Sequence, residues 1–566
     1  MKTILFYLKP HRFRIAYGLF MKGMGTFMDL GLPWVLAYII DDIIPFQQVS
    51  LILWWGLVML GLSVAARSFN VIANRMAAKV ARNSVEVLRH DLFVKIQSLS
   101  GTQVDYFTIP SLESRMTSDT YNIHNMIGMM QRIGIRAPII LIGGVIITST
   151  LEPVLTLVLI GTLPFLGMSV YLVSKKGIPL YTGLQVTIDR MIRVVRENIS
   201  GVRVIKALSK GDFEKRRFTE INHEVSYKEL QAETVMAITN PIMNMILNLG
   251  LTFVIVAGAY RVNAGASEPG KIVAFLSYFT IMLHAVMAIT RIFVISSKAL
   301  ASSKRITQVL DAPPDLSVIE ARLYPTAYHI EFHHVSFSYT QEPYVTEIDF
   351  HIKKGESLGI IGSTGAGKTT LVNLLMRFYD VDAGRITIDG RDVRNFDEKE
   401  LRRKFGVVFQ NDILFADQVS ENIKLGRALS REDIIRALEH AQALSFVEQL
   451  NDKSNDILAM RGSNLSGGQK QRLLVARALA GHPEILILDD SSSALDYKTD
   501  AMLRKEIREH YKDTTTIIIA QRISSVMKLD HILVMEEGRM AGFGTHEDLL
   551  KSCEIYQEIY QSQFKS

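Results

Sequence analysis

Cysteine is almost absent from this chain: its 566 residues include one, Cys553. A single thiol excludes an intrachain disulfide framework and a cysteine metal site, so Cys553 is expected to be inert. The chain also lacks a concentrated basic region. Its net charge is +6, but Lys and Arg are spread along the sequence, many of them beside long apolar runs. That distribution argues against a nucleic-acid partner and is typical of a membrane protein.

A cleavable signal peptide is missing too, because the first apolar run carries charges and no small-residue cleavage site follows it. What the chain does contain is hydrophobic sequence, 48% of its residues. Six apolar segments approach the ~20 residues that a membrane-spanning helix needs. We predict an all-α transmembrane domain of six helices over residues 1–302, with spans near 15–40, 51–72, 133–150, 154–173, 242–261 and 272–295.

The connections between these segments differ in length and charge. Three are short and acidic, containing Asp41, Glu152 and Glu268, whereas the stretches around 75–130 and 174–235 are long and dense in Lys and Arg. Since cations favour the cytoplasmic side, both termini and the long loops are expected in the cytoplasm of a multi-pass cytoplasmic-membrane protein. The loops show helical periodicity, which predicts helices that continue beyond the bilayer.

The composition changes after the membrane segments. Residues 303–328 contain prolines and polar residues typical of a linker. From residue 329 to 566, short β-rich runs alternate with helical patterns, which predicts a mainly parallel α/β domain. The expected strands are 329–339, 357–361, 405–409, 485–488, 515–519 and 531–535.

A glycine-rich loop follows the buried-strand pattern at 357–361. It places backbone N–H groups around phosphate oxygens at the start of a helix, the P-loop arrangement. Lys368 is expected to reach the β- and γ-phosphates, and the Thr369 hydroxyl to ligate Mg²⁺. The predicted ATP-binding residues of this loop are Gly362, Ser363, Thr364, Gly365, Ala366, Gly367, Lys368, Thr369 and Thr370.

A second strand delivers a carboxylate. Residues 485–488 are four apolar residues that end at Asp489, the Walker B arrangement, which predicts that Asp489 helps to hold Mg·ATP. Farther upstream stands Leu-Ser-Gly-Gly-Gln at 465–469. This stretch resembles, at every position, the signature motif of ATP-binding cassette (ABC) transporters.

The resemblance extends over essentially the whole chain, because six spans followed by one cassette look like an exporter half-transporter. It implies that Tyr339 stacks on adenine and that Gln410 contacts Mg²⁺. It also implies a dimer in which each signature caps the ATP of the other half, and short cytoplasmic helices around 109–115 and 210–213 that dock on the cassettes. The residues expected to act across the dimer are Ser466, Gly467, Gly468, Gln469 and, in a D-loop at 493–496, Asp496.

The sequence departs from the family at both hydrolytic positions. Asp490 stands where the glutamate base is usual, and it is one methylene shorter. Gln521 stands where the switch histidine is usual, and it cannot become positively charged. A weaker departure is the lack of a glutamate in 459–462. We predict a transport ATPase whose own site hydrolyses ATP poorly, paired with a non-identical half-transporter that carries the glutamate and the histidine.

The expected function is ATP-driven export of amphipathic small molecules, drugs or lipids, by a heterodimer. Three alternatives stay open: a homodimeric exporter with slow hydrolysis, an exporter of peptides or lipids, and an ATP sensor without transport. The chain begins almost directly with its first span, which argues against a peptide exporter with an N-terminal peptidase domain.

Two charges, Lys22 and Asp29, fall seven residues apart on one face of the first span. An intramembrane charge either lines a pathway or pairs with a neighbouring helix.

Overall fold

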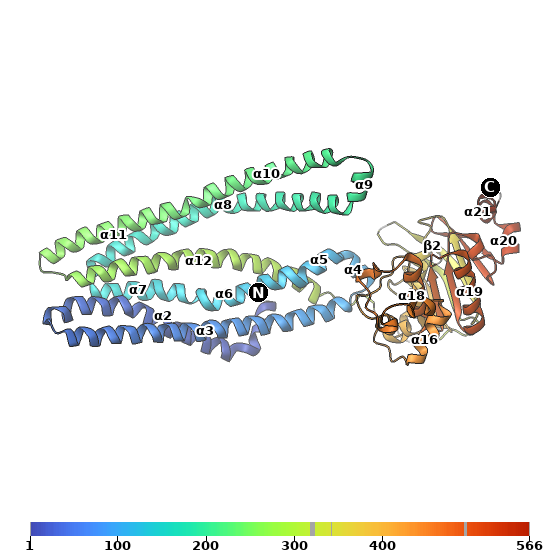
Figure 1. Ribbon diagram of the computed structural model, residues 1–566, viewed down its shortest axis with the longest axis horizontal. Coiled ribbons are helices and arrows are strands. Elements are labelled where there is room, and N and C mark those ends of the chain that lie inside the picture. The colour runs from blue at the N-terminus through green and yellow to red at the C-terminus, as the bar shows by residue number, and fades with distance from the viewer. Residues whose placement is uncertain (1, 317–322, 341, 492–494, 565–566) are drawn as a thin grey trace. The chain divides into compact units, whose positions relative to one another are not determined.

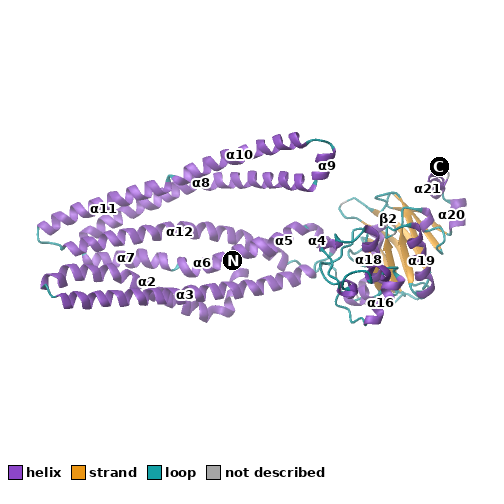
Figure 2. Ribbon diagram, viewed as in Figure 1, coloured by secondary structure: helices purple, strands orange, loops and turns teal. Residues whose placement is uncertain are grey.

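The computed structural model describes residues 2–316, 323–340, 342–491 and 495–564. The chain divides into two compact units. A helical unit contains Met1–Ser98 and Pro110–Ala312, and a sheet unit contains Leu99–Ile109 and Pro313–Ser566. Every described strand belongs to the sheet unit (Figure 2). The predicted fold class, a helical transmembrane part followed by an α/β part, is confirmed.

The helical unit is built from long helices joined by short turns (Figure 1). Its elements are α1 Lys2–Leu8, α2 Arg12–Tyr38, α3 Val49–Gln97, α5 Ile109–Ser114, α6 Thr120–Met129, α7 Arg136–Leu151, α8 Pro153–Ser200, α9 Val202–Ala207, α10 Gly211–Ala237, α11 Thr239–Asn263 and α12 Pro269–Leu310. Glu152 separates α7 from α8, where Pro153 begins the next helix, a position that suits its missing N–H.

Five helical segments of the described chain are long and apolar enough to cross a membrane: Val49–Gln97, Ile109–Leu151, Pro153–Ser200, Gly211–Asn263 and Pro269–Leu310. They contain five of the six predicted spans. The remaining predicted span, the first in the chain, corresponds to α2, a 27-residue helix that carries both Lys22 and Asp29. The assignment of α2 as a span stays a prediction.

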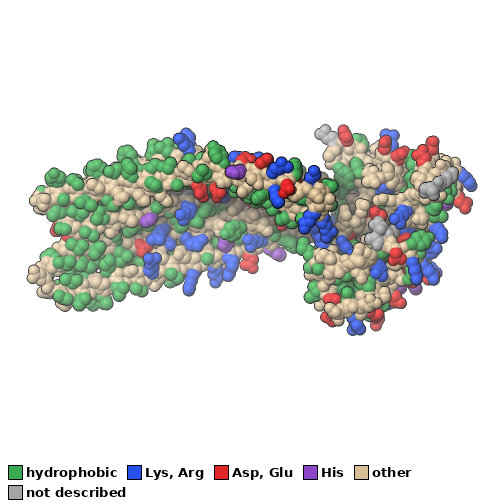
Figure 3. Space-filling model, turned by 45° about the horizontal axis from the view of Figure 1, so that its top comes forward, with side chains coloured by type: hydrophobic (Ala, Val, Ile, Leu, Met, Phe, Trp, Pro, Cys, Tyr) green, Lys and Arg blue, Asp and Glu red, His purple; other side chains and the backbone are tan. Residues whose placement is uncertain are grey.

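The helices continue far beyond a bilayer's thickness. The 49 residues of α3 rise roughly 70 Å, more than twice the ~30 Å of a hydrocarbon core. Hydrophobic side chains gather over the end of the helical unit that holds the α2–α3, α7–α8 and α11–α12 turns, whereas charged side chains gather over its other half (Figure 3). This division is expected when one end of each long helix lies in lipid and the other end lies in water.

The sheet unit contains two sheets. The six-stranded sheet has the order β10-β9-β3-β8-β7-β6 and is parallel except for the β9–β10 pair. The four-stranded sheet, of order β2-β1-β4-β5, is antiparallel. The strands are β1 Ile330–Phe337, β2 Val345–Ile352, β3 Ser357–Gly362, β4 Ala383–Ile388, β5 Arg391–Asp392, β6 Phe405–Val408, β7 Ile485–Asp489, β8 Thr515–Ile519, β9 His531–Glu536 and β10 Arg539–Gly544.

Alternation along the parallel strands builds two cores. In β7, Leu486 and Leu488 face one cluster with the helices that follow β6, while Ile485 and Ile487 face the other cluster with the antiparallel sheet. The helices are α4 Gly101–Phe107, α13 Lys368–Leu375, α14 Glu398–Arg403, α15 Val419–Lys424, α16 Arg431–His440, α17 Leu444–Val447, α18 Gly467–Leu479, α19 Tyr497–His510, α20 His546–Ser552 and α21 Glu554–Phe564.

One detail differs from the sequence predictions. Residues 303–310 are the last turns of α12, so only part of the predicted linker is irregular, and 317–322 lie outside the described residues. Within the sheet unit, the short helix α4 contacts the nucleotide part, because Gly101 can approach its backbone closely. Its N–H donates to the Phe378 carbonyl at 3.0 Å. The predictions of short docking helices around 109–115 and 210–213 stay predictions.

Candidate nucleotide-binding site

The P-loop leaves the carboxyl end of β3 and enters α13. Gly362 has a φ of 157°, and a Cβ there would lie 2.1 Å from the Met535 carbonyl oxygen, so only glycine fits. Gly367, at φ 94°, turns the chain into the helix. The Lys368 ammonium donates to the carbonyls of Gly362 at 2.9 Å and Ser363 at 2.7 Å. Lys368 is thus held over the loop in which phosphates would lie.

Asp489 ends β7 beside this loop. Its Oδ2 accepts a hydrogen bond from the Thr369 hydroxyl at 2.8 Å. Burial raises the pKa of Asp489, and this hydrogen bond opposes the shift. Burial likewise lowers the pKa of Lys368, against the attraction of Asp489 and Asp490. Opposite charges held out of water attract more strongly than at the surface, which keeps these groups positioned.

The two departures from the family meet in space. Gln521 Nε2 lies 3.4 Å from Asp490 Oδ2. Their proximity follows from the sheet: β7 and β8 are parallel neighbours with Asp489 opposite Ile519, and both residues follow those strand ends. Asp490 has a φ of 50°, a left-handed conformation that aspartate tolerates. The two positions thus hold an amide and a short carboxylate that contact each other.

A cavity of about 120 Å³ lies among these groups. It is smaller than typical ligand cavities and fits phosphates rather than a whole nucleotide. Its lining residues are Tyr344, Thr364, Gly365, Gly367, Lys368, Thr369, Thr370, Gln410, Asp489, Asp490, Ile519, Ala520 and Gln521. The hydroxyl, carboxylate and amide oxygens of Thr369, Asp489 and Gln410 are the hard donors that suit Mg²⁺. A bound Mg²⁺ would neutralise phosphate charge there.

Two tyrosines stand at the rim. Tyr339, 43% exposed, places its hydroxyl 3.2 Å from Thr370 Oγ1 but does not line the cavity. Tyr344, which sequence reasoning missed, lines it and donates to the Gly365 carbonyl at 3.3 Å. Its place just before β2 carries no motif, so no sequence signal marked it.

The residues predicted to act across a dimer lie elsewhere in the unit. Ser466 caps α18 and forms a capping box with Gln469. Ser466 and Gly467 are exposed, and neither lines the P-loop cavity. Asp496 caps α19 through Thr499, whereas residues 493 and 494 of the predicted D-loop lie outside the described residues.

Helix α4 is joined to the same site by aromatic contacts. Asp105 accepts a hydrogen bond from the Tyr379 hydroxyl at 2.7 Å. The Tyr379 ring lies 5.2 Å from the Tyr339 ring at 87°, an edge-to-face pair. Within the sheet unit, a set of contacts therefore runs from α4 through Tyr379 to Tyr339 at the rim of the P-loop.

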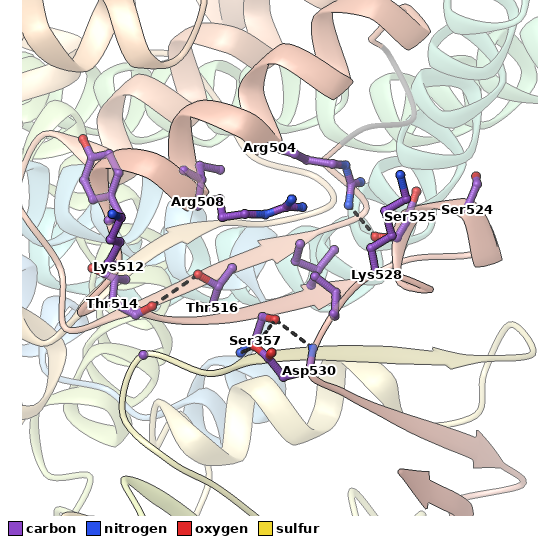
Figure 4. A pocket seen from close by; sticks show the side chains of 15 residues that line it. Ser357, Arg504, Arg508, Lys512, Thr514, Thr516, Ser524, Ser525, Lys528 and Asp530 are labelled. Carbon is purple, nitrogen blue, oxygen red and sulfur yellow. Dashed lines mark hydrogen bonds between the residues drawn. The ribbon is translucent and has the colours of Figure 1, made fainter. Parts of the chain in front are cut away.

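A larger cavity, about 380 Å³, lies at the amino-terminal ends of the parallel strands, whereas the P-loop lies at their carboxyl ends. Ser357 and Thr516, at the starts of β3 and β8, line it together with Arg504 and Arg508 (Figure 4). Nucleotides bind beyond the carboxyl ends of parallel strands, so this cavity is not the ATP site.

In the helical unit, the charges of the first predicted span have different surroundings. Lys22 is buried, and its ammonium donates to Asn70 at 2.8 Å and Asn74 at 3.2 Å. Asp29 pairs with Arg136 at 3.0 Å, and both line a cavity of about 320 Å³. Lys22 therefore serves helix packing, whereas Asp29 borders a space between helices.

Removing one partner of that ion pair is expected to cost more stability than removing both, because a lone charge in an apolar environment stays uncompensated. A double-mutant cycle of Asp29→Leu and Arg136→Leu, followed by thermal unfolding in nanodiscs, should give a coupling free energy of about 1–3 kcal/mol. The exposed pair Asp212 and Lys215 is the control and should show almost none. Equal coupling in both cycles would contradict a partly buried pair that is stronger than the exposed one.

A helical membrane unit joined to a P-loop α/β unit defines a membrane transport ATPase. A family model described as the ABC transporter transmembrane region matches residues 15–286, and one described as ABC transporter matches residues 345–493. The chain belongs to the ABC transporter family, and it has the half-transporter arrangement of an ABC exporter.

Relatives and a solved structure match most or all of the chain. The ABC transporter ATP-binding protein YfiB of Bacillus subtilis is 35% identical over 100% of this chain and 99% of its own length. The ATP-dependent lipid A-core flippase of Methylobacillus flagellatus is 32% identical over 87% and 84%. A bacterial Atm1-family ABC exporter with ATP bound has the same fold, with a TM-score of 0.83, 23% identity and 98% of both chains covered.

Proposed function

We propose that the chain is one half of a heterodimeric ABC exporter that holds ATP at a degenerate site. The observation that carries this proposal is the contact between Asp490 and Gln521 in a site whose P-loop is otherwise complete. Lys368, Thr369 and Asp489 keep the geometry of Mg·ATP binding, while both groups that would activate and position water are replaced. Decay of an unused site would not be so selective.

Geometry explains why Asp490 is a poor base. An aspartate carboxylate ends about 1.5 Å short of a glutamate carboxylate on the same backbone, and misplacement of ~1 Å can cost about 100-fold in rate. Asp490 is also drawn toward Gln521. Gln521 can donate a hydrogen bond but cannot supply a positive charge at the γ-phosphate.

The signature points to a partner. Exposed Ser466 and Gly467, at the N-terminus of α18, present N–H groups suited to a phosphate. Since they do not line this chain's own P-loop cavity, they are free to complete the site of a second half-transporter. That partner would carry the glutamate and the histidine, and its site would hydrolyse ATP.

The substrate is proposed to be an amphipathic small molecule, a drug or a lipid. Among the relatives, lipid A-core flippases carry ATP-dependent lipid translocation in their names. The cavity between helices mixes apolar residues such as Leu36 and Ile281 with Asp29 and Arg136, which suits a molecule with both apolar and charged parts.

We assign residues 1–302 to the transmembrane domain, 303–328 to the connection and 329–566 to the nucleotide-binding domain, with both termini in the cytoplasm.

The test is to purify the chain alone and together with a candidate partner half-transporter that carries the glutamate and the histidine, and to measure ATP hydrolysis by both preparations in nanodiscs. We expect little hydrolysis by the chain alone and strong hydrolysis by the pair. Strong hydrolysis by the chain alone, abolished by Asp490→Asn, would instead establish a homodimeric exporter. ATP-dependent closure of the pair without substrate flux would establish a sensor.

A further inference from the structure

Two histidines of the sheet unit stack where α16 and α19 both end. The rings of His440 and His510 lie 4.4 Å apart at an interplanar angle of 10°. Glu506 is one turn before His510 on α19, and its Oε2 lies 3.3 Å from His510 Nε2. One donor atom of each of the three residues lies within 4.8 Å of the others. None of them lines the P-loop cavity.

We propose that His440, Glu506 and His510 bind a divalent transition-metal ion, for which zinc is the best fit. Two imidazoles and a carboxylate form a donor set that zinc accepts, and imidazole selects against Mg²⁺ and Ca²⁺. Glu506 and His510 stand four residues apart on one helix face, so they can reach one ion together. The site is independent of Mg·ATP.

The buried member of the set is held in place. His440 is 9% exposed, and its Nδ1 lies 3.2 Å from the Tyr511 hydroxyl. This contact fixes the ring and leaves Nε2 as the nitrogen to ligate, as outer partners of metal-bound histidines do.

Metal binding requires a modest side-chain movement. Zinc–nitrogen bonds of about 2.1 Å in a tetrahedron place donor atoms roughly 3.4 Å apart. Glu506 and His510 already meet this spacing at 3.3 Å, while the three donor atoms together lie within 4.8 Å of one another. The His510 side chain is 50% exposed and that of Glu506 28%, so both can turn toward His440 without disturbing the core. The exposed side also leaves a fourth position for water.

The ion would join two parts of the unit that are far apart in sequence. Helix α16 belongs to the helical segment between β6 and β7 and packs against α18, which begins at the signature. Helix α19 follows Asp489 and β7. Bound metal would therefore tie the signature-bearing segment to the strand that carries the Walker B aspartate.

A second cluster, His329 with Asp389 and Glu484, is a weaker candidate. Lys404 forms an ion pair with Glu484 at 2.7 Å, so its ammonium group already lies where the metal would bind. This cluster supplies a matched control, since Asp389 is exposed and its replacement should leave the proposed site intact.

The test is titration of the full-length chain, purified in detergent with a tag that contains no histidine, with ZnCl2 by calorimetry and with CoCl2 by visible absorption. We expect one site per chain with tetrahedral cobalt bands. His510→Ala should weaken zinc binding more than about tenfold and remove the bands, because it deletes a ligand at an exposed position that does not affect folding. Glu506→Gln should weaken binding, and Asp389→Asn should not.

Two results would overturn the proposal. One is an affinity that His510→Ala and Glu506→Gln leave unchanged. The other is binding that Asp389→Asn abolishes while His510→Ala does not, which would place the metal at the second cluster. His440→Ala is a further variant, informative when it elutes as the parent does, because loss of binding with the fold retained supports the buried ligand.

Discussion

Replacing Asp490 by Glu and Gln521 by His together is expected to raise ATP hydrolysis at this chain's own site about 100-fold. In the proposed Mg·ATP site, the P-loop, Thr369 and Asp489 are already in place, so the two substitutions add only what the proposal holds to be missing. Glutamate extends the carboxylate toward the attacking water, and histidine offers a donor that can be protonated. The measurement is phosphate release at saturating ATP by the heterodimer in nanodiscs, with the partner's own hydrolytic site inactivated so that only this chain's site is read.

Each of the two substitutions made alone is expected to give only part of this gain in ATP hydrolysis. Asp490→Glu alone should recover part of it, and Gln521→His alone less, because a correctly placed donor does not activate water without a base. Adding Lys368→Ala to the double variant is the control, since it removes the phosphate contact and should abolish the gain. If the unmodified chain already hydrolyses ATP as fast as the double variant, the degenerate-site proposal is wrong.

Local motifs explain which parts of this site could be predicted from sequence. The P-loop and Asp489 lie in short continuous patterns in which strand, loop and helix follow one another, so their spacing determines their geometry. The strands at 485–489 and 515–519 were predicted almost to the residue, because buried parallel strands are continuous apolar runs.

Contacts between distant segments could not be predicted in this way. The approach of Gln521 to Asp490 depends on β7 and β8 being neighbours, a strand order that no short pattern encodes. Helix α4 is only seven residues long, too short for a periodic signal, and its contact depends on the missing side chain of Gly101. Lys22 could be recognised as an unusual charge, but its two asparagine partners lie on α3, 48 and 52 residues away.

The second large effect concerns the signature. Gly468→Asp is expected to lower ATP hydrolysis by the heterodimer more than about 100-fold, the loss seen when one preorganised donor at a developing charge is removed. The position is the second of α18, where the helix N-terminus would meet the γ-phosphate bound by the partner. A carboxylate there repels phosphate. Asp490→Asn in the same heterodimer should leave hydrolysis nearly unchanged, because this chain's own site contributes little.

A loss of activity in the Gly468→Asp variant must be distinguished from a loss of folding. Aspartate in the first turn of a helix is stabilising, so Gly468→Asp should not unfold α18, and thermal unfolding should confirm this. Lys505→Gln, on the exposed face of α19, changes net charge by the same amount and should keep activity. If Asp490→Asn abolishes hydrolysis while Gly468→Asp does not, the roles of the two sites are reversed. In that case this chain supplies the base, and its signature faces the inactive site.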